Sequence, residues 1–316
     1  MKVALAGQGA FGVKHLEGIA NIPGIEVVSL AGGSPESTEQ VARAWNIPHW
    51  TTDLTETLQQ PGVEAVILAT PTQMHAAQAQ QVMLAGKHVE VEIPIADNLR
   101  DAEHLLRAQR DAHVVAMAGH TRRFNPSHQW IHQRVERGEL TIQQMDVQTY
   151  FFRRTNTNAL GKPRSWTDHL LWHHACHTVD LFAYQTGEQP AIAHAIQGPK
   201  HPDLGIAMDM SIQLKNPGGA ICTLSLSFNN DGPLGTFFRY ICDNGTYLAR
   251  YDDLFDGKNE QIDLSGVAVS MNGIELQDRE FFSAIAEGRE PNSSIADVLP
   301  SYRTLDRLER ELEADR

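Results

Sequence analysis

The sequence predicts an α/β fold of two domains: an N-terminal Rossmann domain with a doubly wound parallel sheet, and a C-terminal α+β domain with an open, mainly antiparallel sheet. A glycine fingerprint lies between a predicted strand and a predicted helix at the start of the chain. Predicted strands and helices alternate up to about residue 120, and segments with two-residue alternation of apolar and polar side chains follow. These observations predict a nucleotide-binding domain over residues 1–120 and a second domain over residues 121–316.

The fingerprint is Gly7-Gln8-Gly9-Ala10-Phe11-Gly12, and the apolar run 3–6 before it is typical of a buried strand. A helical pattern follows, which supplies the strand–turn–helix context that the motif needs. Gly7 permits the tight turn, Gly9 lets the backbone approach a pyrophosphate, and Gly12 lets the helix pack close to the strand. The helix N-terminus then faces the negative charge, so all six residues are predicted to bind a dinucleotide.

The other elements of the first domain follow in βαβ order, and either Asp53 or Thr55 caps one short helix. Apolar runs without alternation are typical of parallel strands that are buried on both faces. The predicted strands are Ile25–Leu30, Ala65–Ala69, Lys87–Val91 and Val114–Met117, and the predicted helices are Ser37–Trp45, Leu54–Leu58, His75–Ala85 and Leu99–Ala112.

Alternating segments dominate the second domain and predict antiparallel strands with one solvated face. The segment Asp243-Asn244-Gly245-Thr246 is a strong hairpin turn between two of them. We expect helices on one face of the sheet and a homodimer interface on the other. The predicted strands are Gln144–Phe151, Met208–Leu214, Ile221–Phe228, Phe237–Cys242 and Tyr247–Tyr251, and the predicted helices are Asp168–Tyr184, Glu275–Glu287 and Ile295–Ala314.

The composition is that of an ordinary globular protein, with 41% hydrophobic and 21% charged residues. A net charge of −13 argues against binding to nucleic acid or to an anionic membrane, which both need positive surface. The three cysteines, Cys176, Cys222 and Cys242, have no paired spacing, so we expect no disulfides and a cytoplasmic location. Because a predicted strand occupies the first residues, we expect no signal peptide, and no apolar run is long enough to span a membrane.

Several motifs, in order along the chain, resemble the glucose–fructose oxidoreductase and inositol dehydrogenase (Gfo/Idh/MocA) family. After the fingerprint come Ala69-Thr70-Pro71-Thr72-x-x-His75 and Gly86-Lys87-His88-Val89-x-x-Glu92-Ile93-Pro94. Arg123-Phe124-Asn125-Pro126 and His177-x-x-Asp180 extend the resemblance into the second domain. The resemblance implies a nicotinamide-dependent oxidoreductase whose cofactor site includes Thr70, Pro71, Thr72, His75, Glu92, Ile93 and Pro94.

Three further segments, Gly119–His128, Val147–Arg154 and Arg164–His174, resemble one branch of this family. The resemblance implies oxidation of the cyclic hemiacetal of a protocatechuate 4,5-cleavage product to 2-pyrone-4,6-dicarboxylate, with NADP as the acceptor. The wider family usually has a lysine where this chain has Ile93, and often an acid where it has His173. The lysine helps to polarise a sugar hydroxyl, so its absence argues against a generic sugar-alcohol mechanism.

The cofactor preference is inferred from the end of the second predicted strand. An NAD enzyme usually has an acid there to hold the ribose diol, and none occurs before Glu36. The small residues Gly32, Gly33 and Ser34 leave room for a 2′-phosphate, although the expected arginine is also missing. We predict NADP as the preferred cofactor and NAD as a second acceptor. The alternative is a glycine-rich turn without selectivity.

The predicted helix over residues 168–184 carries the candidate catalytic residues His173, His177 and Asp180. The two histidines share a face because they lie at i and i+4. Loss of hydride from a hemiacetal requires loss of the hydroxyl proton, and neutral imidazole suits this near neutral pH. His177 is predicted to be the base because it holds the motif position of the family. His173 is its partner or a donor to substrate, and Asp180 orients a histidine or has a structural role.

Two other interpretations of this helix stay open. Paired histidines at this spacing also suit zinc, with His169, His174 or Asp180 as the third ligand. The glutamate of a zinc protease motif is missing, so we predict no metal. The remaining alternative is an ordinary amphipathic helix whose histidines are structural.

Five arginines stand out in this acidic chain: Arg122, Arg123, Arg153, Arg154 and Arg164. A guanidinium pairs with a carboxylate in bidentate geometry, so they are predicted to bind a small dicarboxylate substrate, although pairing with surface acids is the commoner fate of arginine. Adjacent arginines on an extended segment point to opposite faces, so only one of Arg153 and Arg154 is expected to reach a given pocket. The pocket is predicted to be completed by Trp166, His169 and Asn229.

These residues and the resemblance together predict a dehydrogenase that transfers hydride from the cyclic hemiacetal to NADP with a histidine base. The nearest alternative is an NAD(P)-dependent sugar or inositol dehydrogenase of the same family. A non-catalytic NADP-binding regulator would bind the cofactor without reducing it. A metal hydrolase built on the histidine helix would be sensitive to chelators.

Overall fold

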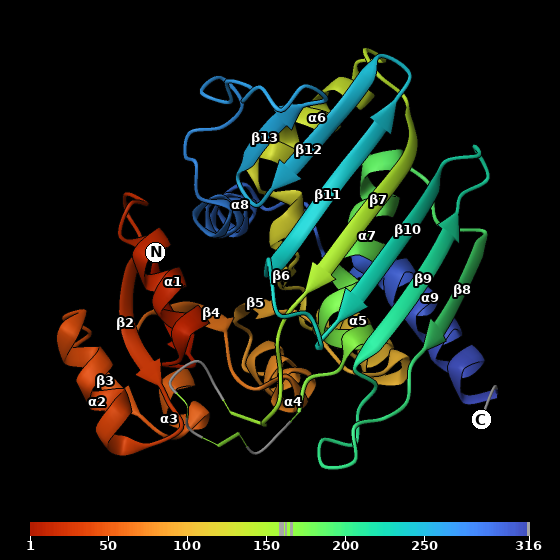
Figure 1. The fold of residues 1–316 in the computed structure, drawn as a ribbon. Coiled ribbons are helices and arrows are strands. Elements are labelled where there is room, and N and C mark those ends of the chain that lie inside the picture. The colour runs from red at the N-terminus through yellow and green to blue at the C-terminus, as the bar shows by residue number, and fades with distance from the viewer. Residues whose placement is uncertain (158–160, 162, 165–166, 315–316) are drawn as a thin grey trace. The chain divides into compact units, whose positions relative to one another are not determined.

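The computed structural model describes residues 1–157, 161, 163–164 and 167–314 (Figure 1). The chain divides into two compact units. Unit 1 contains Met1–His120 and Ile274–Leu299, and unit 2 contains Thr121–Gly273 and Pro300–Arg316. Among the described residues, every helix is too short or too polar to span a lipid bilayer.

Unit 1 is built on a sheet of six parallel strands. The strands are β1 (Lys2–Ala6), β2 (Glu26–Ala31), β3 (His49–Thr51), β4 (Val63–Leu68), β5 (His88–Glu92) and β6 (Ala116–Gly119). Their order, β3-β2-β1-β4-β5-β6, is that of the doubly wound dinucleotide-binding fold, which confirms the predicted Rossmann domain. The connection order reverses between β1 and β4, so the turns after these two strands lie at the switch point where such folds bind ligands.

The helices of unit 1 begin close to the predicted positions. They are α1 (Ala10–Ile19), α2 (Pro35–Ala44), α3 (Leu54–Leu58), α4 (Thr72–Leu84), α5 (Leu99–Ala112) and α8 (Gly273–Glu287). Asp53 rather than Thr55 caps α3, because its carboxylate accepts the Thr55 N–H at 2.8 Å. Strand β3 was not predicted, since three residues are too few to show a pattern.

The predicted second domain, residues 121–316, is not one continuous block, because segment 274–299 belongs to unit 1. The N–H of Ala118 donates to the carbonyl of Ser293 at 2.8 Å, which extends the edge of the sheet beside β6. On α8, Asp278 is hydrogen-bonded to His15 of α1, 263 positions away in sequence. Local patterns cannot reveal pairings between residues so far apart. The first segment of unit 1 ends at His120.

Unit 2 is built on a seven-stranded sheet. Its strands are β7 (Ile142–Tyr150), β8 (Ile192–Gln197), β9 (Asp209–Lys215), β10 (Ile221–Ser227), β11 (Gly235–Cys242), β12 (Gly245–Arg250) and β13 (Asp253–Asp256). The order is β13-β12-β11-β7-β10-β9-β8, and β7 and β10 pair in parallel while the other neighbours are antiparallel. The predicted hairpin is confirmed, with Cys242 opposite Gly245. Strand β8 was not predicted because its exposed positions hold Ile192 and Ile196 and its buried ones hold alanines, which obscures the alternation.

Helices cover one face of this sheet, as predicted (Figure 1). They are α6 (Pro126–Glu136), α7 (Cys176–Thr186) and α9 (Ile295–Ala314), with a π-helical turn, η2 (Leu170–Ala175), directly before α7. Because helices cover only one face, the residues of strand β9 alternate strictly between buried and exposed.

A single α-helix was predicted over 168–184. This prediction is wrong for its first turn, because η2 is a π-helical turn, which is wider than an α-helix. Such π-turns are frequent at functional sites.

Candidate functional site

The glycine turn after β1 has the geometry of a pyrophosphate cradle. Gly7 has a φ of +114°, and a Cβ there would lie 2.3 Å from the carbonyl oxygen of Ala69. A Cβ on Gly12 would lie 1.8 Å from the carbonyl oxygen of Gly7, so α1 packs directly on the turn. Among the described residues, nothing lies within 4 Å of a Cβ on Gly9, and no side chain caps α1. The N–H groups of the first turn, which begins at Ala10, can therefore face a phosphate, and these residues fit the dinucleotide that the motif implies.

Gln8 joins this turn to the turn after β2. Its Oε1 accepts the N–H of Gly33 at 3.0 Å, and its Nε2 donates to Oγ of Ser37 at 2.9 Å. The hydroxyls of Ser34 and Ser37 lie 2.7 Å apart, which groups two hydroxyls at the N-terminus of α2. A Cβ on Gly32 would lie 2.8 Å from Oε1 of Gln8. The side chain of Thr38, whose Oγ1 would lie 1.9 Å from this Cβ, and that of Gln8 therefore crowd the position where an NAD enzyme carries its acid.

The turns after β4 and β5 are held together by His75 on α4, which is buried. Its Nε2 lies 2.7 Å from the carbonyl oxygen of Thr70, and its Nδ1 lies 2.8 Å from that of Pro94, which follows a cis peptide bond. Burial lowers the pKa of His75 below its ordinary value, and the two carbonyls oppose this shift. His75 thus positions two of the predicted cofactor turns, and direct contact with a cofactor stays a prediction for these residues.

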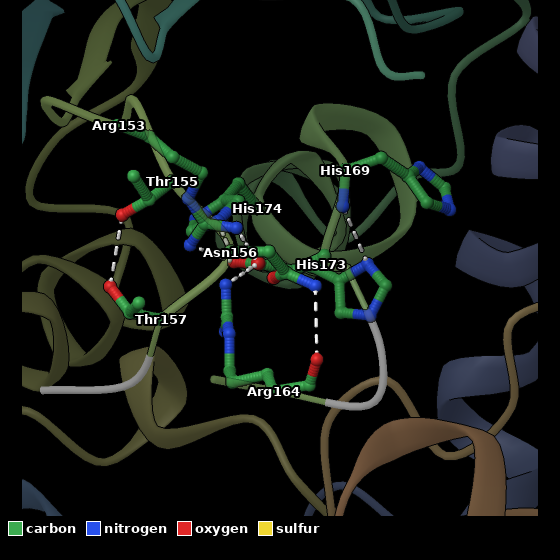
Figure 2. A network of polar contacts seen from close by, with 9 residues as sticks. Arg153, Thr155, Asn156, Thr157, Arg164, His169, His173 and His174 are labelled. Atoms are coloured by element: carbon green, nitrogen blue, oxygen red, sulfur yellow. Dashed lines mark hydrogen bonds and ion pairs between the residues drawn. The ribbon is translucent and has the colours of Figure 1, made fainter. Parts of the chain in front are cut away.

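In unit 2, two arginines and a histidine, which are labelled in Figure 2 as Arg153, Arg164 and His174, converge on the carboxylate of Asp168. Both terminal nitrogens of Arg153 donate to it, with Nη2 and Oδ2 2.8 Å apart. Nη2 of Arg164 lies 2.7 Å from Oδ1, and Nε2 of His174 lies 3.2 Å from Oδ2. The guanidinium of Arg153 also lies over the ring of Phe228, 4.6 Å from its centroid. This cluster joins the segment after β7 to the entry of η2.

The Asp168 cluster carries an excess of positive charge. Burial raises the pKa of the Asp168 carboxyl, but hydrogen bonds from His174 and Arg153 outweigh this and hold the pKa well below its ordinary range. The carboxylate is therefore ionised, and among the described residues of this cluster one negative charge faces two guanidinium charges. Such a partly buried excess suits binding of a small carboxylate.

Next to this cluster, the backbone N–H of His169 donates to Nδ1 of His173 at 3.1 Å (Figure 2), and the two rings lie edge to face 4.9 Å apart. Because Nδ1 is an acceptor, the proton of the neutral His173 ring sits on Nε2. His173 is therefore suited to donate a hydrogen bond rather than to accept a proton. This favours the other candidate, His177, which is half-buried in the first turn of α7.

Arg123 and Asp180 are paired with each other. Nε and Nη2 of Arg123 each lie 2.7 Å from a carboxylate oxygen of Asp180, and both side chains are buried. The pair joins η1 (Thr121–Arg123) to α7 and gives both charges a structural partner. This ion pair gives both residues a structural role but tests neither of their predicted roles. Contact between Arg123 and the substrate and a catalytic role for Asp180 stay predictions.

The other predicted substrate residues are spread over unit 2. Nη1 of Arg122 donates to Oδ1 of Asn125 at 3.3 Å, and burial lowers the pKa of Arg122. Nη1 of Arg154 donates to Oδ1 of Asn229 at 3.0 Å. Adjacent Arg153 and Arg154 thus reach different partners, as the alternation predicts. Trp166 lies outside the described residues.

Sequence reasoning missed Asp168, the residue around which this site is organised. The signal available was its position four residues after Arg164, close enough along the chain for an ion pair. Ser37 was also missed, because its bond to Gln8 joins two turns 29 positions apart in the sequence.

Two family models match the chain. Residues 1–120 match the oxidoreductase family with an NAD-binding Rossmann fold, Gfo/Idh/MocA, and residues 126–268 match the C-terminal domain of bacterial oxidoreductases. In its fold, the chain is similar to levoglucosan dehydrogenase in complex with NADH and levoglucosan, with a TM-score of 0.86 at 20% identity and coverage of 100% and 98% of the two chains. It is likewise similar to an oxidoreductase from Agrobacterium radiobacter in complex with NAD⁺, L-tartaric acid and magnesium, with a TM-score of 0.82 at 18% identity and coverage of 100% and 97%.

Sequence relatives are closer. The chain is 66% identical over 313 residues to 4-carboxy-2-hydroxymuconate-6-semialdehyde dehydrogenase of Sphingobium sp. (strain NBRC 103272 / SYK-6), with 99% of each chain covered. It is 30% identical over 141 residues to an NAD⁺-dependent scyllo-inositol 2-dehydrogenase of Bacillus subtilis (strain 168), with 44% of this chain and 41% of the other covered. The parallel sheet, the glycine cradle and these matches confirm the predicted resemblance, and the chain belongs to the Gfo/Idh/MocA family of oxidoreductases.

Proposed function

We propose that this chain is an NADP-dependent dehydrogenase that oxidises the cyclic hemiacetal of 4-carboxy-2-hydroxymuconate-6-semialdehyde to 2-pyrone-4,6-dicarboxylate, a step of protocatechuate 4,5-cleavage. The observation that carries the proposal is 66% identity, across 99% of both chains, to a dehydrogenase named for this semialdehyde. The inositol dehydrogenase of Bacillus subtilis aligns with only 44% of this chain, which makes a polyol the weaker candidate.

The charge of the Asp168 cluster supports an anionic substrate. Two guanidinium groups and one imidazole share a single carboxylate, so a substrate carboxylate can bind the remaining positive charge. A neutral sugar or inositol has no group that needs this charge. We therefore assign one carboxylate of the substrate to Arg153, Arg164 and His174.

The mechanism follows from these roles. The glycine cradle of residues 7–12 would hold NADP, which would supply the hydride acceptor for the carbon that carries the hydroxyl group. His177 takes the proton of this hydroxyl and passes it to solvent, so each hemiacetal gives one lactone, one NADPH and one proton. His173 donates a hydrogen bond from Nε2 to a substrate oxygen. The arginines hold the carboxylate and thereby fix the orientation of the reacting carbon.

Absorbance of reduced nicotinamide tests the proposal directly. The purified protein is mixed with NADP or NAD and with semialdehyde made in situ by ring cleavage of protocatechuate. We expect rapid reduction with this substrate and none with myo-inositol or glucose. Reduction with the polyols alone would support the sugar dehydrogenase, and NADPH binding without reduction would support a regulator.

The NADP preference is proposed from the turn after β2. Ser34 and Ser37 offer two hydroxyls at the N-terminus of α2, where a 2′-phosphate is stabilised by the backbone N–H groups. The crowding at Gly32 leaves no place for the acid that selects NAD. Because the loop has no arginine and Glu36 lies in the first turn of α2, we expect the preference for NADP to be moderate and NAD to be accepted.

Replacing Ser37 with alanine is expected to lower kcat/KM for NADP by roughly tenfold or more, because one hydrogen bond to a charged phosphate is lost. The same change should leave kcat/KM for NAD nearly constant, which makes NAD the internal control. Steady-state kinetics with both cofactors measure the ratio. An equal loss with both cofactors would contradict a 2′-phosphate contact and indicate damage to the turn itself.

We also propose a homodimer that forms through the face of the seven-stranded sheet opposite the helices. This face has a depression of about 290 Å³, whose lining includes Tyr150, Phe237, Leu248, Arg239 and Arg250. An aromatic surface with arginines is typical of protein interfaces. Sedimentation velocity measures the mass, and a monomer at assay concentrations would refute the dimer. The three buried, free thiols are in keeping with a location in the cytoplasm.

A further inference from the structure

A second cluster of ionisable side chains lies inside unit 1, among residues that the proposed mechanism does not use. His15 of α1 is fully buried, and each of its ring nitrogens faces a carboxylate. Nδ1 lies 2.7 Å from Oδ1 of Asp278 on α8, and Nε2 lies 3.1 Å from Oε1 of Glu92 at the end of β5. One imidazole ring therefore connects three elements that are distant in the sequence.

Both ring nitrogens of His15 must carry a proton to bond two ionised carboxylates, so the ring is an imidazolium. Burial acts to lower the pKa of His15, but Asp278 and Glu92 together raise it well above the ordinary value. Burial likewise acts to raise the pKa of Glu92, but the bond from His15 brings it below its ordinary value. Burial also raises the pKa of Asp278 above its ordinary value, and the positive charge of His15 and its hydrogen bond oppose this shift. The geometry, with a carboxylate at each ring nitrogen, favours a positive ring between two carboxylates.

The other polar groups around the ring of His15 are compatible with its positive charge. Glu90 is fully buried, and its Oε1 accepts a hydrogen bond from Gln277 at 2.7 Å. Burial, together with the negative charge of Asp278, raises the pKa of Glu90 well above its ordinary value, which favours the neutral form of this carboxyl. The charged groups that also act on the cluster are Glu275 of α8, which is paired with Arg279, and His75 of α4.

The elements joined by His15 are those that carry the predicted cofactor residues. His15 lies three positions after Gly12 on α1, the helix that starts at the glycine cradle. Glu92 is the last residue of β5 and comes directly before Ile93 and Pro94. The same carboxylate oxygen of Glu92 also accepts from Nε2 of Gln277 at 3.2 Å, so α8 supports the strand end a second time.

We propose that His15 is a positioning residue for the cofactor: its doubly protonated ring, held by Asp278 and Glu92, keeps the glycine cradle and the turn after β5 in the arrangement that binds NADP. The proposal rests on the proposed cofactor but not on the proposed substrate. Loss of one ring proton leaves one carboxylate without its donor. Affinity for NADPH therefore has its full value at neutral pH and decreases as the pH rises through the raised pKa of His15.

A divalent cation is the alternative occupant, because ligand atoms of His15, Glu90 and Asp278 lie within 4.8 Å of one another. The separation of 2.7 Å between Nδ1 and Oδ1 is that of a charge-assisted hydrogen bond, however. A histidine nitrogen that binds a metal carries no proton, and here both nitrogens face acceptors. The distances and donors of this cluster thus fit hydrogen bonds through the two ring protons of His15 better than coordination of a metal ion.

The state of His15 can be measured without turnover. The apo protein is labelled with ¹⁵N-histidine, and NMR follows the ring nitrogens from about pH 6 to pH 9, a range that spans ordinary imidazole titration. We expect one ring that stays doubly protonated above the range of the other histidines, with signals that disappear in His15→Gln. In Asp278→Asn, which preserves the shape of the side chain, this ring should lose its second proton at lower pH. The exposed His104→Gln is the matched control for resonance assignment.

Binding of NADPH, followed by its fluorescence, tests the positioning role. We expect His15→Gln and Asp278→Asn to raise the Kd by roughly 10- to 100-fold, because displacement of binding groups by an ångström has effects of this size. Their kcat at saturating NADP should change much less than KM for NADP. The affinity of the wild type should fall at alkaline pH, and that of His15→Gln should not depend on pH in this range.

Two comparisons keep the test decisive. Phe281→Leu, at a fully buried residue of the same helix α8, lowers stability without changing the charge cluster, and it should leave the Kd for NADPH unchanged. An equal loss of affinity in Phe281→Leu and Asp278→Asn, a neutral His15 at pH 7, or a stoichiometric divalent ion that is lost in Asp278→Asn would each overturn the proposal. Because the NMR titration and the binding of NADPH use no semialdehyde, a wrong substrate leaves these two outcomes interpretable.

Discussion

Replacing His177 with alanine is expected to lower kcat for hemiacetal oxidation by roughly 10²- to 10⁴-fold, the contribution of a general base. The Kd for NADPH should stay nearly constant, because His177 of α7 is not part of the glycine cradle that is proposed to hold the pyrophosphate. The wild-type rate should fall toward low pH, since a protonated imidazole cannot accept the hydroxyl proton. This acidic limb should be missing from the residual activity of the variant. Steady-state kinetics between about pH 5.5 and 9 measure both effects.

Two matched variants separate the base from its neighbours. His173→Ala should raise KM and lower kcat more modestly, and it should keep the acidic limb, because Nδ1 of His173 accepts the N–H of His169 and its proton sits on Nε2. The exposed His104→Ala should behave as the wild type. A variant of His177 that keeps the acidic limb, together with a variant of His173 that loses it, would exchange the two roles.

Replacing Arg164 with methionine is expected to raise KM for the dicarboxylate substrate by roughly 10- to 150-fold, which corresponds to the loss of about 1.5–3 kcal/mol for a hydrogen bond to a charged group. Asp168 keeps its bonds to Arg153 and His174, so the carboxylate stays ionised while the excess positive charge is removed. The effect should appear in KM for the substrate and in the inhibition constant of the product dicarboxylate. KM for NADP should not change.

Arg154→Met is the matched control, because the exposed Arg154 bonds to Asn229 and to backbone carbonyl groups rather than to Asp168. Its KM for the substrate should change much less than that of Arg164→Met. Equal effects of the two changes would argue for general electrostatic steering by the surface. A normal KM in Arg164→Met would remove the Asp168 cluster from substrate binding.

Much of the fold could be predicted because its signals are local. The helix over 99–112 and the last helix over 295–314 have the predicted bounds, since capping residues and helical periodicity lie within a few positions of each other. The hairpin between β11 and β12 was predicted from four consecutive residues. By contrast, the short strands β3 and β13 contain too few residues for a pattern. The π-turn of η2 has no local signature in residue type.

In the candidate site too, the features with a local sequence signal could be predicted and those that depend on distant contacts could not. The glycine cradle was predicted residue by residue, because backbone φ angles and close approach restrict Gly7 and Gly12 almost independently of context. The arginines were singled out by their charge, but the sequence alone could not tell that Arg123 is paired with Asp180, 57 positions away. Ion pairs depend on distances of a few ångströms, which only the folded chain supplies.

By itself, the sequence determined the family, the parallel nucleotide-binding sheet and the residue types available for proton transfer and carboxylate binding, because backbone geometry and side-chain chemistry are properties of short segments. Only the tertiary structure decided which charged groups lie close enough to form ion pairs. It brought Arg153, Arg164 and His174 to Asp168, and it placed His15 between Glu92 and Asp278, residues up to 263 positions away. Burial and proximity set the protonation state of each group, and both arise when distant segments pack together.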